Sequence, residues 1–214
     1  MRTDELIEML STNIEPVDRA RLARSLGLAV AGGAAGALVA VLFTLGVRPD
    51  LGNTGALGFV LLKFAFTVGV VGVSSLYLTR LARPGGERTV LPVRALAPFG
   101  VIVLLASLSL VSAPRTHWES MIVGDMWLEC LLSIPIIAIV PFTVIVWAVR
   151  RFASPTDLAR TGAFVGLTAG GISAMGYALH CTDDSLPFIA LWYGGTIALC
   201  TLAGAMLGPK LLRW

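Results

Sequence analysis

The sequence predicts an all-α protein, a polytopic membrane bundle of six transmembrane helices with both termini in the cytoplasm. Three observations support this prediction: the composition, six long apolar runs and an uneven distribution of arginine and lysine. Of the 214 residues, 56% are apolar and 14% are charged, whereas a soluble domain has roughly 45–50% apolar and about 25% charged residues. The composition therefore excludes a soluble catalytic domain, and it also excludes an intrinsically disordered chain.

The apolar residues fall into six continuous runs. We expect transmembrane spans at residues 26–47, 55–78, 95–113, 126–149, 162–179 and 186–207. Each run is close to the length of about 20 residues that a helix needs to cross the core of a bilayer. Because the backbone finds no water partner in lipid, each span is expected to be helical. Continuous runs also differ from the short alternating segments of a membrane β-barrel.

The first two spans and the connection before the third each carry one distinguishing feature. Gly32 and Gly36 form a GxxxG pattern in the first. Lys63 is the only cation within a span, and ionisable groups buried in membranes are costly and often functional. Glu129 is a candidate partner for it. Gly85 and Gly86 make the connection before the third span rich in turn-forming residues.

The last three spans are marked by proline and glycine. Pro135 and Pro141 in the fourth span are typical of kinked membrane helices. Glycines spaced four residues apart lie on one face of a helix and let helix backbones approach closely. The fifth span carries Gly162, Gly166 and Gly170, followed on the same face by Ala174, and the sixth carries Gly204 and Gly208. We favour packing within one bundle, and a homodimer formed through these glycine-rich helix faces is the alternative.

Charge gives the orientation. Outside the spans, arginine and lysine divide thirteen to two between the two sides, and the poor side has only Arg48 and Arg115. Cytoplasmic loops are enriched in these residues. Residues 1–24 are therefore expected to be a cytoplasmic N-terminal segment and residues 25–214 the six-helix transmembrane domain. The outer connections are residues 48–54, 114–125 and 180–185, and the net charge of +3 reflects orientation rather than direct binding of nucleic acid.

The N-terminal segment predicts a short amphipathic helix. Thr3 can cap it, apolar residues recur at helical spacing, and acidic residues occupy the other face. Negative charge disfavours an anionic membrane surface, whereas an acidic and apolar helix suits a groove on a protein. The candidate partner-binding residues are Asp4, Glu5, Leu6, Ile7, Glu8, Met9 and Leu10. The alternative is a cap folded against the bundle's own inner face, or a frayed tail.

Two cysteines are expected at the same outer rim. Cys130 lies near the outer end of the fourth span and Cys181 lies just beyond the fifth, next to His180. Such thiols can form a disulfide in an oxidising compartment, be oxidised, or bind a soft metal ion, with His180 as a third candidate ligand. The alternative is that they are small apolar core residues, and Cys200 within the sixth span is assigned to packing.

Sequence motifs give no support to an enzyme. The chain has no Walker loop, GxSxG or HExxH motif and no paired carboxylates within the spans. No required cofactor is expected, and the only metal considered is a transient heavy-metal ion at Cys130 and Cys181. A small transporter or metal-efflux protein is the alternative function class, although no repeated halves with matched broken helices support it.

Several stretches together resemble a known family. The opening MRTDELIEMLSTN (1–13), the run HCTDDS (180–185), the following LWY (191–193) and the closing GAMLGPKLLRW (204–214) are similar to NrsF-like membrane anti-sigma factors, and Cys130 and Cys181 match the paired cysteines of that family. The resemblance implies a six-helix protein of the bacterial inner membrane that keeps an extracytoplasmic-function (ECF) sigma factor from RNA polymerase. It further implies that the N-terminal segment holds sigma and that the outer cysteines sense oxidative or heavy-metal stress.

Overall fold

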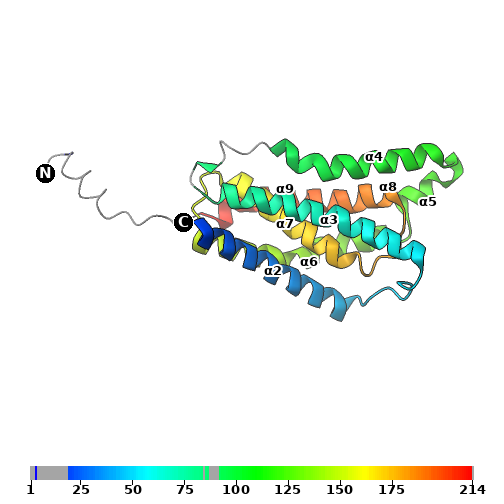
Figure 1. Cartoon of the computed structure of the whole chain (residues 1–214), viewed down its shortest axis with the longest axis horizontal. Coiled ribbons are helices and arrows are strands. Elements are labelled where there is room, and N and C mark those ends of the chain that lie inside the picture. The colour runs from blue at the N-terminus through cyan, green and yellow to red at the C-terminus, as the bar shows by residue number, and fades with distance from the viewer. Residues whose placement is uncertain (1–2, 4–18, 84, 87–91, 214) are drawn as a thin grey trace.

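The computed structural model describes residue 3 and residues 19–83, 85–86 and 92–213, which form helices joined by short connections, without a strand among them (Figure 1). The α-helices are α2 (Arg19–Thr44), α3 (Thr54–Leu81), α4 (Ala97–Ser112), α5 (Trp118–Val123), α6 (Trp127–Phe152), α7 (Leu158–Tyr177), α8 (Leu186–Phe188) and α9 (Gly194–Leu211). The 3₁₀ turns η2 (Pro92–Leu96) and η3 (Arg115–His117) precede α4 and α5. A π-helical turn, η4 (Ile189–Tyr193), joins α8 to α9. The predicted all-α class is confirmed.

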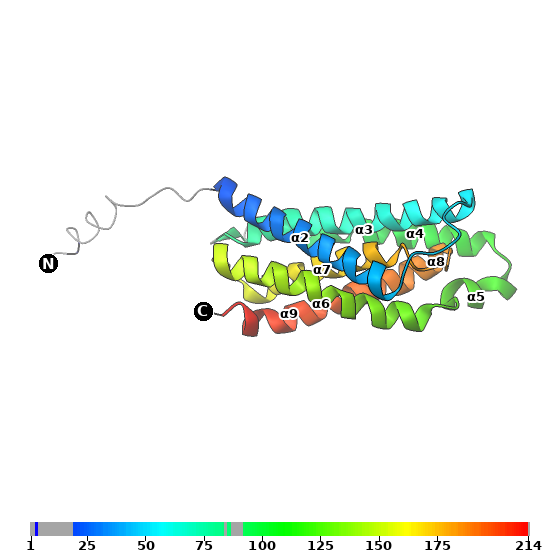
Figure 2. The same ribbon diagram turned by 90° about the horizontal axis from the view of Figure 1, so that it is seen from below.

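Helix α7 lies at the centre of the bundle. It contacts α2, α3, α6 and α9, and every residue from Phe164 to Ala174 is buried. Figures 1 and 2 show the other long helices running beside it along the same axis. Helix α4 is the peripheral element, because only Ile102 and Ala106 of its residues are buried.

Among the described residues, five helices are suited by length and composition to cross a membrane, whereas the sequence predicts six spans. Apolar helical stretches of sufficient length are Ala20–Thr44, Thr54–Leu81, Val93–Ser112, Arg115–Phe152 and Leu186–Leu211. Helix α7 coincides with the expected span at 162–179 but is not one of the five. Because neighbouring helices cover it, α7 carries glycine, serine and threonine where a helix facing lipid carries large aliphatic residues.

The glycine faces of α7 and α9 pack against each other within one chain. A Cβ atom placed on Gly166 would lie 2.2 Å from the carbonyl oxygen of Cys200, and one on Gly162 would lie 2.2 Å from that of Gly204. Close backbone approach of this kind is what glycine permits. We call this contact the glycine seam. It is the intramolecular packing favoured by the sequence, and it occupies the faces that a homodimer through α7 or α9 would use.

In α2 the glycine contact is displaced by one residue from the predicted pair. A Cβ atom placed on Gly36 would meet Val140 of α6 and one placed on Gly33 would meet Pro141, whereas one placed on Gly32 would meet nothing within 4 Å. The GxxxG spacing therefore identified the correct helix but named Gly32 wrongly. Pro141, one of the two prolines expected to kink α6, lies inside that helix and packs against α2.

The two ends of the bundle differ in composition. One end holds the starts of α2 and α7 and the ends of α3, α6 and α9, and among its described residues it contains Arg80, Arg83, Arg150, Arg151, Arg160 and Lys210. We call it the basic end. The opposite end contains Cys130, Cys181 and a tryptophan pair, Trp127 and Trp192, whose rings are 5.4 Å apart. We call it the cysteine end.

Candidate functional site

The candidate site is built around the connection from α7 to α8, residues 180–185, which we call the strap. Helix α7 has 20 residues and α3 has 28, so α7 is shorter by about 12 Å at 1.5 Å per residue. Their basic ends are level, because Ser154, just before α7, donates its amide to the carbonyl of Ala82 at the end of α3. The strap therefore begins below the rim of the bundle and lies among the ends of the other helices.

Arg48, in the connection between α2 and α3, uses all three guanidinium nitrogens, and both terminal nitrogens reach the strap. Nε and one terminal nitrogen bond Asp50 at 2.6 and 2.7 Å. The two terminal nitrogens bond Asp184 at 2.9 and 2.7 Å, and one of them also donates to the carbonyl of Cys181 at 3.0 Å. These hydrogen bonds raise the pKa of Arg48 further and hold the pKa of Asp50 below its ordinary value.

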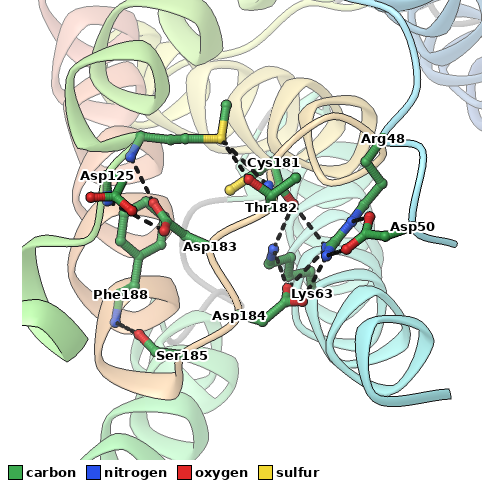
Figure 3. A network of polar contacts seen from close by, with 11 residues as sticks. Arg48, Asp50, Lys63, Asp125, Cys181, Thr182, Asp183, Asp184, Ser185 and Phe188 are labelled. Carbon is green, nitrogen blue, oxygen red and sulfur yellow. Dashed lines mark hydrogen bonds and ion pairs between the residues drawn. The ribbon is translucent and has the colours of Figure 1, made fainter. Parts of the chain in front are cut away.

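Lys63 of α3 converges on the same two acceptors from inside the bundle (Figure 3). Its side chain is 0% exposed, and Nζ lies 3.0 Å from the carbonyl oxygen of Cys181 and 3.1 Å from Asp184 Oδ1. Nζ also lies 5.9 Å from the centroid of the Tyr193 ring. The partner suggested by the sequence, Glu129, is wrong, since that carboxylate instead lies 3.8 Å from Nε2 of His180.

The burial of these two cations is compensated by their partners. Removing a charge from water costs several kcal/mol unless the ion is paired and hydrogen-bonded. Asp184 supplies the shared negative charge and Asp50 supplies a second one, so the four charged groups balance. The sequence pattern alone does not assign Arg48, Asp50 or Asp184 to a site. The sequence does contain a signal for this network. Asp183 and Asp184 lie in an outer connection, on the same side of the membrane as Arg48, and Lys63 is the only cation within a predicted span.

The other side of the strap is fastened to α5 and α6. The carboxylate of Asp183 accepts the backbone amides of Met126 at 2.7 Å and Asp125 at 3.3 Å, at the start of α6. Carboxylates are favourable at this position because the first amides of a helix have no partner within it. Thr182 donates its amide and its hydroxyl to the sulfur of Met126.

The last residue of the strap bonds two further elements. The hydroxyl of Ser185 donates to the carbonyl of Met121 in α5 and accepts the amide of Phe188, which caps α8. Gly124 lies beneath these contacts with a φ of 61°, and a Cβ atom there would lie 2.7 Å from both Asp183 and Phe188. His180, the first residue of the strap, lies 3.3 Å from the carbonyl of Gly46. With the contacts above, each residue from His180 to Ser185 contacts a part of the chain outside the strap.

The two cysteines expected at one rim both lie at this end, Cys181 within the strap and Cys130 in α6, to which the strap is attached. Cys130, in the first turn of α6, and Cys181 are both 0% exposed and both are free thiols. Burial raises the pKa of Cys181, and nearby Lys63 opposes that shift. Cys200 lies apart from them on α9, where its Cβ faces Gly170 of α7. In this conformation both thiols of the pair are closed to solvent.

The expected metal ligands are not assembled into a cluster. Over the described ranges, no group of three or more His, Cys, Asp or Glu side chains could hold a metal ion. His180 is turned toward Gly46 and Glu129, and the remaining donor set is the two thiols. Two thiolates suit a soft ion rather than a hard one. The expected partner-binding residues, Asp4, Glu5, Leu6, Ile7, Glu8, Met9 and Leu10, lie outside the described residues.

Comparison with known proteins gives a consistent result over the whole chain. Residues 10–214 match the model of the family described as NrsF, negative regulator of sigma F. The chain is 33% identical to the anti-sigma-F factor NrsF of Caulobacter vibrioides and 31% identical to the probable anti-sigma-F factor NrsF of Azospira oryzae, and in both cases the match covers all of each chain. No solved structure matches.

Proposed function

This chain belongs to the NrsF family of negative regulators of sigma F, and from that premise we propose that it is a membrane anti-sigma factor. It sequesters a sigma factor of the ECF class through residues 1–24 and releases it when Cys130 and Cys181 meet a heavy-metal ion or an oxidant. The observation that carries the proposal is the family match over residues 10–214, together with two full-length relatives named as anti-sigma factors. Such regulators bind a protein partner and are not enzymes.

The proposed location is the bacterial inner membrane, which the chain crosses several times. Five long apolar helices support a position in the lipid bilayer. The basic end faces the cytoplasm, because cytoplasmic segments are enriched in Lys and Arg. Helix α2 starts at this end, so residues 1–24 are on the side where sigma and RNA polymerase are found. The cysteine end faces the outside, where metal ions and oxidants arrive.

The proposed sigma-binding element is the acidic and apolar start of the chain. The spacing of Leu6, Met9 and Leu10 predicts one apolar face of a helix, and Asp4, Glu5 and Glu8 supply negative charge. An amphipathic helix binds a partner by placing its apolar face in a groove, and its charges select a basic rim. The complementary surface on sigma is therefore apolar with basic residues around it.

The proposed signal is a reaction at the cysteine pair. An oxidant that takes two electrons from the thiols can join them as a disulfide, with two protons released, and a soft ion can bind the two thiolates instead. Either event moves the strap relative to α6, which carries Cys130, and α7, to which the strap is attached. A hundredfold release of sigma requires only about 2.7 kcal/mol of coupling between the two ends.

Deletion of residues 1–20 tests the sigma-binding assignment. The tagged full chain in native membranes should retain its sigma factor on purification, and the deletion variant should lose it while keeping the same amount in the membrane. An internal control replaces Lys210 at the basic end by Met, which leaves residues 1–24 intact. Equal recovery of sigma with the deletion variant would contradict the assignment.

Replacement of Cys130 and Cys181 by serine tests the sensor assignment. We expect the double variant to retain sigma when the cells are challenged with a heavy metal or an oxidant, and Cys200→Ser to respond as the parent does. A normal response in the double variant would show that the signal is received elsewhere. Flux of metal ions through proteoliposomes, without a sigma partner, would favour the transporter alternative.

A further inference from the structure

The two thiols proposed as sensors are closed to solvent, so something must control when they can react. We propose that Lys63 and Arg48 are positioning residues that hold the strap in its closed position, in which Cys181 of the strap and Cys130 of α6 are both buried, and thereby set the reactivity of both thiols. The biological meaning of this inference rests on the proposed sensor function. The inference itself concerns only access to the thiols.

The contacts of the two cations converge on the residue that must move. Lys63 and Arg48 each donate to the carbonyl of Cys181 and each bond the carboxylate of Asp184. The cations come from α3 and from the α2–α3 connection, whereas both acceptors belong to the strap. These contacts fix the backbone on both sides of Thr182, and the Cys181 thiol is fixed with it (Figure 3).

Differences in exposure indicate the direction in which the strap opens. The side chains of Lys63 and Arg48 are 0% and 1% exposed, whereas that of Asp184 is 21% exposed. When the strap moves outward, Asp184 enters water, but Lys63 stays inside the bundle without its carboxylate. An unpaired buried cation is strongly unfavourable, so the two cations resist opening. The same cost makes the closed strap the resting state.

The fastenings on the other side of the strap are of a different kind. Asp183 and Ser185 bond backbone groups at the start of α6 and in α5, and these contacts involve no buried cation. They hold the strap to α6, the helix that carries Cys130. Exposure of Cys181 therefore depends on breaking the contacts with Lys63 and Arg48, while the contacts of Asp183 and Ser185 keep the strap attached to α5 and α6.

The test measures the reaction rate of the thiols in the full-length chain. We choose the Cys200→Ser background in lipid nanodiscs, so that only Cys130 and Cys181 can react with a polyethylene glycol maleimide. Each reacted thiol adds a countable mass on a gel. Asp184→Asn and Lys63→Met should label about tenfold faster than the background or more, since a shift of about 1.4 kcal/mol in opening gives a factor of ten. Adding Cys130→Ser or Cys181→Ser assigns the rate to each thiol.

Two controls separate positioning from a general loss of structure. Lys210 is the chain's other lysine and lies at the basic end, so Lys210→Met should label at the background rate. Asp184→Glu keeps the carboxylate and should label more slowly than Asp184→Asn. If Lys63→Met fails to fold, Asp184→Asn decides the matter, because it changes a partly exposed residue.

The results that overturn the inference are distinct from those that overturn the proposed function. Folded Asp184→Asn and Lys63→Met proteins that label within about twofold of the background would show that the cations do not govern access. Recovery of sigma is measured on the same variants. Fast labelling with sigma still bound would leave the positioning role intact and would contradict the proposal that the cysteine end controls release.

Discussion

The strap and the glycine seam hold the bundle together by different means. In the seam, backbone meets backbone, and no side chain can be moved to loosen it: the carbonyl oxygen of Cys200 lies only 2.2 Å from the position that a Cβ atom on Gly166 would take. In the strap, the side chains of Arg48 and Lys63 bond one short connection, and that connection's own Asp183 and Ser185 side chains bond backbone groups next to α6 and in α5. Such contacts can be exchanged for water or for a ligand. The seam is therefore suited to fixed packing, and the strap is suited to a change of state.

The largest expected effect is at the seam. Gly166→Leu places a side chain against the backbone of α9, and we expect loss of the folded, monodisperse protein, since overpacking alone costs about 1–3 kcal/mol and backbone cannot give way. Gly32→Leu is the matched control, because Gly32 has open space around it on α2. Size-exclusion chromatography in detergent measures the folded fraction. Equal folded fractions for the two variants would show that the seam is not a tight contact.

A smaller effect is expected where the strap rests on α6. Gly124 has a positive φ, and a Cβ atom there would meet Asp183 and Phe188. Gly124→Ala should lower stability by about 1–3 kcal/mol through backbone strain and displacement of Asp183. We expect faster labelling of Cys130 by maleimide along with a lower melting temperature. Gly100→Ala on α4, where nothing lies within 4 Å, is the comparison. A melting temperature unchanged from the parent in Gly124→Ala would contradict the strain argument.

The seam and the strap also differ in how far the sequence predicts them. The glycine spacing in the fifth and sixth spans predicts a close helix contact, because each pattern repeats along one face. The spacing could not distinguish Gly32 from Gly33 in α2, because the two glycines are adjacent. Only the rotation of α2 about its own axis determines which of them faces α6. The span at 162–179 is a helix as predicted, but its central position makes it less apolar than a helix facing lipid.

The sequence predicts which residue types gather at the site, but it does not predict how deep in the bundle each of them lies. The sequence places Cys130, Cys181 and His180 at one end, and the structure does the same. It could not supply the partner of Lys63, which lies nine residues into α3, or about 14 Å below the start of the helix. That partner, Asp184, is within reach only because α7 ends early and lets the strap enter the bundle. Helix ends are the feature that apolar patterning determines least well.

The smallest expected effect separates the exposed edge of the strap network from its buried centre. Asp50 is 43% exposed and bonds Arg48, which holds the pKa of the Asp50 carboxyl below its ordinary value. A carboxyl whose pKa is lower in the folded state stabilises the protein above its unfolded pKa of about 3.9, and that stabilisation is lost as the pH falls through the folded value.

We therefore expect Asp50→Asn to have a slightly lower melting temperature than the parent at neutral pH. The two melting temperatures should converge in acid, below about pH 4. Solvent screening keeps the difference small, because exposed ion pairs contribute little. Asp184→Asn should lower the melting temperature more at neutral pH, since it removes the carboxylate that two buried cations share. Equal effects of the two substitutions would mean that the buried centre is no stronger than its exposed edge, and the strap would then lose the feature that distinguishes it from an ordinary surface loop.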